Sequence, residues 1–407
     1  MSQQLDKRVE YAIDQLWVNP WNGDGKKAKD MLEEAANEGN GDAYFFLGRC
    51  YLGECYVNPR FGFEENIDLG MEYFNKSIEL GSAIGMFGAQ RLGGFEPRGG
   101  SYVHSPYTSL KEIWDEVNNL AENGQVFCQY MIGNAYYYGD CLEMLGYNDD
   151  QVDLPLIQSF QKKAIEMFEK CVDKGFAMAA VNLIDILTSG EYGMPIDQKR
   201  AGEVKKRGAE LHNPFCECQL ARTLEDTNIE QALELYQRSI THGGDDAYYY
   251  LGELYLWGTK LPKDLLKAKH YYEKGLEANS HVIGCKNGLG KMYFDGVDGI
   301  EQDYNKAFGF FKETRPENKW CSDMLGTCYL KGLGTSVNYE AAKEEFLVYP
   351  DEELSAIGLG EIYCYGLGVK QNIRTGMEYL NKFPNHPRVK EIKSHFKRGL
   401  FGWKQIN

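Results

Sequence analysis

The stretch AYYYLGELYLWG at residues 247–258 decides the fold, because the chain repeats its pattern along most of its length. The pattern is a small residue, then Leu-Gly four positions later, Tyr at the eighth position and Gly near the eleventh. Clear copies read AYFFLGRCYLG from residue 43, CQYMIGNAYYYG from 128, CKNGLGKMYFDG from 285, CSDMLGTCYLKG from 321 and SAIGLGEIYCYG from 355, and weaker copies begin at 83, 179 and 216. Copies recur about every 40 residues, a period typical of stacked helix pairs.

Each copy is predicted to form an α-helix with one buried face. The small residue, the Leu and the Tyr stand at offsets 0, 4 and 8, which share one side of a helix with 3.6 residues per turn. Glycine beside the Leu, as at Gly252, weakens a helix by about 1 kcal/mol relative to Ala. Its recurrence predicts that a neighbouring helix approaches the backbone closely at this point.

A second amphipathic run follows each copy, for example KAKDMLEEAANEG from residue 27, KAIEMFEKCVDKG from 163 and KAKHYYEKGLEAN from 267. Several of these runs end at a glycine where a helix would finish in the left-handed conformation, namely Gly39, Gly81, Gly124, Gly175 and Gly243. A pair of helices this short cannot bury its apolar faces alone, so the pairs are expected to stack. The sequence therefore predicts an all-α fold of about nine to ten helix-pair repeats.

The pattern resembles the Sel-one-like repeat family, a branch of the tetratricopeptide-like α/α repeats. The family signature is A-x-x-x-L-G-x-x-Y-x-x-G followed by K-A-x-x-Y-x-x-K-A, and the resemblance covers nearly all of residues 26–382. It implies a right-handed α/α superhelix, or solenoid, that serves as an adaptor for protein complexes. It does not identify the partner.

Three segments are expected along the chain. Residues 1–25 would form an N-terminal capping helix and linker, residues 26–383 the repeat solenoid, and residues 384–407 a C-terminal capping helix with a basic outer face. Two insertions, near 93–108 and 140–155, break the repeat spacing. They are either tolerated surface loops or loops with a specific contact role.

The composition indicates which classes of partner the chain can bind and where it acts. The net charge of −16 argues against nucleic acid and against anionic membrane surfaces, and favours a protein or peptide partner. The first residues lack an apolar signal core, and no stretch has the roughly 20 apolar residues of a membrane span, so a cytoplasmic location is expected. Of the eleven cysteines, Cys128, Cys216, Cys285 and Cys321 occupy the small buried position of the repeat, which predicts reduced core thiols.

A search for catalytic chemistry yields no candidate. The chain contains no HExxH, no GxSxG elbow, no phosphate loop and no dinucleotide-binding glycine fingerprint. Cys216 and Cys218 are two apart and point in different directions on a helix, and no second Cys or His pair lies at zinc-finger spacing. The sequence therefore predicts a protein that is not an enzyme and that has no cofactor and no metal site.

Partner binding is expected on the first helix of each pair, at offsets 3, 6, 9 and 10 beside the buried stripe. Aromatic and Arg anchors among polar neighbours are what a peptide-binding groove needs. Tyr138, Trp257 and Tyr365 all hold offset 10, so stacked repeats would place them in a row. The predicted concave groove is lined by Arg49, Asn134, Tyr138, Glu253, Trp257, Lys291, Lys331, Glu361 and Tyr365.

Three functions thus remain from different classes. The first is a non-catalytic scaffold or adaptor that holds a partner in the concave groove of the first helices. The second is an enzyme or small-ligand receptor with a pocket inside the superhelix, which a compact pocket with perturbed carboxylates would favour. The third is a structural protein that associates with itself through incompletely capped ends.

Overall fold

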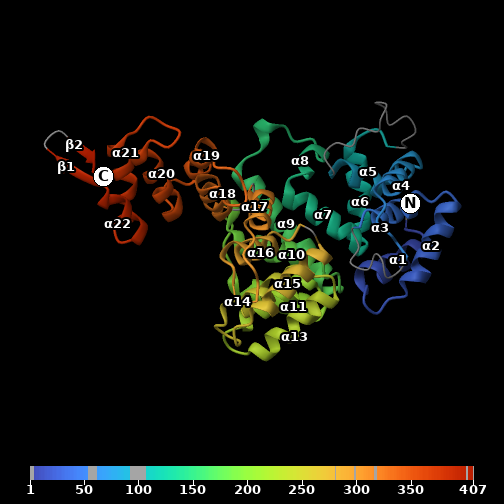
Figure 1. The fold of residues 1–407 in the computed structure, drawn as a ribbon. Coiled ribbons are helices and arrows are strands. Elements are labelled where there is room, and N and C mark those ends of the chain that lie inside the picture. The colour runs from blue at the N-terminus through green and yellow to red at the C-terminus, as the bar shows by residue number, and fades with distance from the viewer. Residues whose placement is uncertain are drawn as a thin grey trace. The chain divides into compact units, whose positions relative to one another are not determined.

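Helices make up most of the described chain in the computed structural model (Figure 1). The contacts divide the chain into two compact units, Met1–Gly244 and Asp245–Asn407, and each is described by itself. Of the predicted insertion near 93–108, residues 93–106 lie outside the described residues. The structure describes residues 4–53, 62–91, 107–279, 281–297, 299–315, 319–399 and 402–406.

Every copy of the sequence pattern forms a helix, including the weaker copies from 83, 179 and 216. These nine first helices, counted over the described residues, confirm the predicted repeat. They are α3 (Gly41–Tyr51), α5 (Ala83–Arg91), α7 (Val126–Tyr138), α10 (Ala179–Ser189), α12 (Pro214–Leu224), α14 (Asp246–Trp257), α16 (Ile283–Asp295), α18 (Lys319–Lys331) and α20 (Glu353–Tyr365).

A second helix follows each first helix. The nine are α4 (Ile67–Glu79), α6 (Leu110–Glu122), α9 (Leu154–Asp173), α11 (Gln198–Glu210), α13 (Ile229–Thr241), α15 (Leu265–Ala278), α17 (Tyr304–Thr314), α19 (Tyr339–Val348) and α21 (Ile373–Leu380). Each begins behind an Asp, Asn or Ser whose side chain accepts a backbone N–H of the first turn, as Asp264 does from Lys267. Such a cap contributes about 1 kcal/mol, so local sequence fixes where each second helix starts.

The buried stripe explains how the two helices of a pair pack. Ala247 and Leu251 of α14 are fully buried, as predicted for offsets 0 and 4. Tyr255, at offset 8, is only half-buried and stacks on Tyr271 of α15, with ring centroids 5.7 Å apart and an interplanar angle of 8°. The repeated tyrosine therefore joins the first helix to the second from the edge of the core rather than from its centre.

Glycine beside the buried Leu permits this close packing, as predicted. A Cβ added at Gly290 of α16 would lie 2.7 Å from Cε1 of Phe311 in α17, closer than real Cβ contacts allow. Aromatic rings of the second helices therefore fill the space that the missing side chains leave. At the ends of the second helices, Gly39 and Gly243 adopt φ of 88°, which confirms the predicted left-handed termini.

The cysteines behave as core residues. The ten that the structure describes are all buried, and the four predicted at the small position of the repeat are fully so. Burial raises the pKa of the Cys171 and Cys216 thiols to about 12, which keeps both protonated at neutral pH.

Before the first of these nine pairs, α1 (Lys7–Ile13) continues as a π-helical turn, η1 (Asp14–Val18), and α2 (Gly25–Asn37) follows. Trp17 is buried against Phe46 of α3, with ring centroids 5.2 Å apart. The insertion near 140–155 contains the short helix α8 (Cys141–Met144) and a 3-10 turn, η3 (Asp149–Gln151). Another 3-10 turn, η4 (Glu191–Gly193), follows α10. The domain bounds at 25 and 383 stay predictions.

The C-terminal segment corrects one prediction. A single closing helix was expected across 384–407, but α22 (Pro387–Ser394) ends early and two antiparallel strands follow, β1 (Phe396–Gly399) and β2 (Gly402–Gln405). Gly399 and Gly402 form one pair of the two strands, and glycine at these positions disfavours a continued helix. The basic residues are divided between α22, where Lys390 is exposed, and the hairpin, where Lys397 pairs in register with Lys404. Both hairpin side chains are exposed.

Candidate functional site

A cavity of about 920 Å³ opens in the second unit between the first helices of two consecutive repeats. We call it the α14–α16 groove. Its wall from α14 includes Tyr250, Glu253 and Trp257, and its wall from α16 includes Gly288, Lys291 and Asp295, with Trp320 of α18 beside them.

The groove coincides with the predicted offsets. All four residues at offsets 3, 6, 9 and 10 of the copy from Ala247 line it, and so do three of the four from Cys285, Phe294 being the exception. Glu253, Trp257 and Lys291, three of the nine predicted partner-binding residues, thereby come together in one cavity. Their role in binding a partner stays a prediction.

Glu253 organises the wall that α14 contributes. One carboxylate oxygen accepts a hydrogen bond from Nε1 of Trp257 at 2.8 Å, and the other accepts from the hydroxyl of Tyr272 at 2.5 Å. Tyr272 is fully buried, whereas the Trp257 side chain is 65% exposed. Burial and the Glu253 charge together raise the pKa of Tyr272 and keep its hydroxyl a donor. A large exposed indole is thus held in one orientation next to a carboxylate that is itself fixed from the core.

Acidic groups predominate along the groove. Asp245, Asp246, Glu253 and Asp295 line it, against Lys263 and Lys291, and Lys291 is already ion-paired with Asp295. Burial, followed by the neighbouring charge of Asp245, raises the pKa of Asp246 above its usual value. A cation that entered the groove would relieve this repulsion.

The predicted site residues of the first unit lie in different surroundings. The Arg49 guanidinium lies over the rings of Phe45 and Phe127, 5.8 and 5.0 Å from their centroids. Asn134 is buried and its side-chain oxygen accepts a hydrogen bond from Asn182 of α10 at 2.5 Å, which makes it an inter-repeat contact. Tyr138 is 58% exposed.

The last predicted residues lie near the C-terminus. Lys331 is exposed at the end of α18. Glu361 accepts a bidentate ion pair from Arg388 of α22, and the Tyr365 hydroxyl shares a 2.6 Å hydrogen bond with Nδ1 of His395. Tyr365 also packs on Phe396 of β1. The C-terminal segment therefore covers two side chains that were expected to face a partner.

A small cavity of about 230 Å³ in the first unit bears on the enzyme alternative. It is lined by Asp42 of α3, Glu116 of α6 and Tyr107. The pKa of Asp42 is raised, first by burial and then by the charge of Glu116, although a hydrogen bond from the Ser82 hydroxyl at 2.5 Å opposes this. One perturbed carboxylate is thus present beside the Ser82 hydroxyl, but no histidine or lysine is among the described lining residues.

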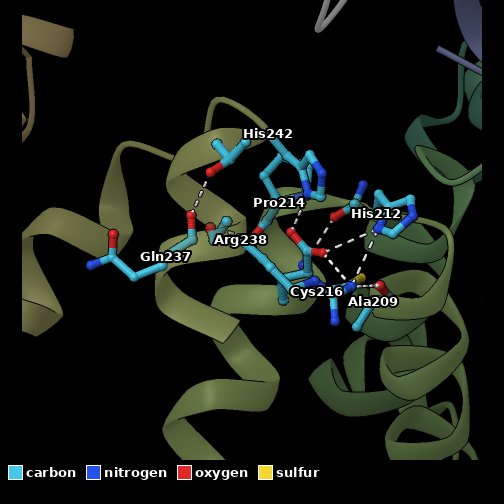
Figure 2. A network of polar contacts seen from close by, with 11 residues as sticks. Ala209, His212, Pro214, Cys216, Gln237, Arg238 and His242 are labelled. Atoms are coloured by element: carbon cyan, nitrogen blue, oxygen red, sulfur yellow. Dashed lines mark hydrogen bonds and ion pairs between the residues drawn. The ribbon is translucent and has the colours of Figure 1, made fainter. Parts of the chain in front are cut away.

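A third arrangement was missed by sequence reasoning. His212, Glu217 and His242 converge with Arg238 where α11, α12 and α13 meet, and Figure 2 shows both imidazole rings turned toward one polar network. Glu217 is fully buried, and it accepts 2.7 Å contacts from Arg238 and from Nδ1 of His242. One sequence signal was available: His212 replaces the glycine that ends other second helices, and it keeps their left-handed backbone with φ of 61°.

Comparisons with known structures support the fold. The chain is similar to a protective antigen present in uropathogenic Escherichia coli strains displaying an SLR fold, with 21% identity and a TM-score of 0.57 over 95% of this chain and 78% of that one. It is also similar to a Sel1 repeat protein from Oxalobacter formigenes, with 19% identity and a TM-score of 0.51 over 82% of this chain and 89% of the other. At these identities the likeness shows the fold alone.

One curated relative matches a shorter stretch. The ERAD-associated E3 ubiquitin-protein ligase component HRD3B of Arabidopsis thaliana is 30% identical over 115 residues, which is 28% of this chain. The match spans only 17% of that relative's length. Among the helices that the structure describes, none has the length and apolar character of a membrane span.

The family model gives the broadest match. Sel1 repeats are found at residues 20–40, 41–82, 126–150, 223–244, 245–280, 285–313, 323–344 and 354–383. Together these cover more than half of the chain. They fall on helices of the repeats described above, except that the first covers α2, which precedes the nine pairs. Proteins built from this repeat are generally non-catalytic scaffolds for protein interaction. The chain belongs to the Sel1 repeat family.

Proposed function

We propose that this chain is a non-catalytic scaffold that binds an extended segment of a partner protein in the α14–α16 groove, and that the segment presents a basic side chain beside an apolar one. The observation that carries the proposal is the pairing of Glu253 with the exposed Trp257 at the edge of a cavity of about 920 Å³. An indole and a carboxylate side by side offer a cation both a π-face and a negative charge.

The Trp257 ring is already ordered before a partner binds, which supports the α14–α16 groove as the binding site. Ordering a tryptophan on binding costs conformational entropy, and here the hydrogen bond to Glu253 has already restricted the ring. The cavity volume is large enough for several side chains of a peptide. The predominance of acidic groups, together with the net charge of −16, favours a basic segment over nucleic acid or an anionic membrane. We place the activity in the cytoplasm, which agrees with a core that contains ten buried cysteines.

The relative from Arabidopsis is named as a component of a ligase, and the scaffold role proposed here agrees with that name. A catalytic role has weaker support, because the described lining of the cavity beside Asp42 contains no histidine or lysine that would act as a base on the Ser82 hydroxyl or as an acid. Self-association through the chain ends stays an alternative, which a mass measurement at several salt concentrations tests.

Selection from a random peptide library displayed on phage tests the proposal directly. Selected peptides are expected to carry Lys or Arg next to an aromatic or aliphatic residue. Their affinity, measured by fluorescence anisotropy, should fall about 30-fold in Trp257→Ala, the loss of a hot-spot aromatic. The matched control is Leu347→Ala, which removes an exposed apolar side chain of α19 outside the groove. Peptides without a basic residue, or equal binding to both variants, would overturn the proposal.

A further inference from the structure

The cluster of His212, Glu217 and His242 has the composition of a metal site. One ligand atom from each residue, a ring nitrogen of either imidazole or a carboxylate oxygen of Glu217, can be chosen so that all three lie within 4.8 Å of one another. Ligand atoms around a tetrahedral zinc ion stand about 3.4 Å apart, so a modest movement of one side chain closes the set. His212 can supply that movement, because it follows the end of α11 and its side chain is 38% exposed.

Arg238 stands at the centre of this cluster. Its Nη2 atom lies 2.7 Å from Oε1 of Glu217, 3.2 Å from Nδ1 of His212 and 3.0 Å from the carbonyl oxygen of Ala209 (Figure 2). A guanidinium nitrogen carries two hydrogens, so it cannot satisfy three acceptors fully. A metal ion accepts several donors at once. The Glu217 carboxylate, the His212 ring nitrogen and the Ala209 carbonyl thus surround one point, which the Arg238 guanidinium occupies. Its two hydrogens cannot bond fully to all three acceptors.

Two further features hold the ligands in place. The ring of Trp21 packs against the ring of His242 at a centroid distance of 4.3 Å, which fixes that imidazole. His212 adopts φ of 61°, a left-handed conformation that other repeats assign to glycine. A histidine in this conformation costs roughly 1 kcal/mol relative to glycine, and such strain is common at functional positions. The left-handed backbone itself ends α11, as it does in other repeats, and the unusual feature is that histidine rather than glycine adopts it.

We propose that His212, Glu217 and His242 bind a divalent transition-metal ion of the zinc class, and that Arg238 moves toward solvent when the ion binds. Two imidazoles and one carboxylate are a recurrent zinc ligand set, whereas calcium and magnesium prefer oxygen ligands alone. The Arg238 side chain is 44% exposed and has the length to leave. The bound ion would join the ends of α11 and α13 to α12, and its fourth position would remain open to water or to a ligand from outside.

The experiment is a zinc titration of the metal-free full chain, with thiols kept reduced and a chromophoric chelator as competitor. Wild type is expected to bind one equivalent and to melt at a higher temperature with zinc than with magnesium. Cobalt should give a tetrahedral visible spectrum without thiolate charge-transfer bands, which separates this site from cysteine ligation.

Variants of the cluster have opposite expected signs. His212→Gly restores the residue that the left-handed position ordinarily carries, so the fold should persist while zinc affinity falls by at least about tenfold. His242→Ala should lose zinc likewise. Arg238→Gln removes the competing cation, so zinc should bind more tightly and raise the melting temperature more than in wild type.

The matched control is His270→Ala, which removes an exposed histidine of α15 far from the cluster in sequence. It should bind zinc as wild type does. If His212→Gly or His242→Ala retains wild-type affinity, or wild type binds no zinc, the cluster is a structural ion-pair network and the proposal fails. Weaker zinc binding in Arg238→Gln would equally contradict the displacement of Arg238.

Discussion

Glu253 and Trp257 stand one helical turn apart on α14, and the Glu253 carboxylate accepts the indole N–H of Trp257 at 2.8 Å while its other oxygen accepts the buried hydroxyl of Tyr272. One carboxylate thus links the core to an exposed aromatic ring. The charge and the hydrogen-bonding capacity of Glu253 have separate consequences, which two substitutions distinguish.

Glu253→Gln removes the charge and keeps one of the two acceptor oxygens, which the buried Tyr272 hydroxyl can use. Its melting temperature should remain close to that of wild type, while the affinity for a basic peptide falls about tenfold and loses most of its salt dependence. Glu253→Ala should in addition destabilise the protein by about 1–3 kcal/mol, because the buried Tyr272 hydroxyl loses its partner. Peptide titrations at two salt concentrations and thermal melts measure both effects. Unchanged peptide affinity in both variants would show that the bound peptide does not interact with the Glu253 carboxylate.

Gly290 tests why glycine recurs beside the buried Leu of the repeat. Glycine is needed there because the neighbouring helix leaves no room for a Cβ, not because the backbone adopts an unusual conformation. Gly290→Ala should destabilise the α16–α17 pair by about 1–3 kcal/mol, since the new Cβ would lie 2.7 Å from Phe311. Hydrogen exchange of peptides from α16 and α17 measures the local opening free energy.

Gly309 of α17 provides the matched control for this pair. An added Cβ there meets no atom within 4 Å, so Gly309→Ala should stabilise the helix by up to about 1 kcal/mol through helix propensity alone. Stabilisation by both substitutions would show that the close approach of Phe311 does not constrain the repeat.

The repeated helix pairs could be predicted from the sequence because residues close together in the chain specify each helix. Offsets 0, 4 and 8 define a buried helix face, and capping residues such as Asp264 mark where the next helix begins. The same periodicity selected Glu253, Trp257 and Lys291, which line one cavity, whereas the other six predicted residues lie outside it. This reasoning needs no knowledge of distant contacts.

The features that escaped prediction depend on contacts between separate elements. His212, Glu217 and His242 lie on three segments and match no motif spacing, so only the fold brings them together. In the C-terminal segment, Val389, Ile392 and Phe396 fit a helical period, but the chain forms a hairpin from Phe396 onward. The repeat offset alone places Tyr365 in the predicted groove, whereas in the structure its ring packs on Phe396.

Tyr365 is therefore expected to act in stability and not in partner binding. Tyr365→Ala removes the hydrogen bond to His395 and the packing on Phe396, which should cost about 1–3 kcal/mol and increase hydrogen exchange in α22 and the hairpin. The affinity for selected peptides should not change. Tyr138→Ala, which truncates a 58% exposed ring, is the comparison with little expected effect on stability. Loss of peptide affinity without faster exchange in Tyr365→Ala would return this residue to the binding surface.

Asp42 makes the free energy of unfolding depend on pH, and the burial of its carboxyl decides the direction of that dependence. The pKa of Asp42 is raised in the folded state, chiefly by desolvation, so the folded protein holds this proton more tightly than the unfolded chain does. Folding is then favoured most at low pH, and this contribution is lost as the pH rises from the ordinary value of 3.8 through the raised pKa.

Asp42→Asn removes this term and keeps an acceptor for the Ser82 hydroxyl. The variant should therefore be more stable than wild type at pH 7, and its advantage should shrink as the pH falls toward 4, measured by thermal melts across that range. Asp68→Asn is the control, because Asp68 is an exposed acid in the first turn of α4, where its charge favours the helix by about 0.3–1 kcal/mol at neutral pH. That substitution should slightly destabilise at pH 7. If both variants lose stability there, the Asp42 carboxylate is better solvated or better paired than its burial indicates, and a binding role for the cavity that it lines gains support.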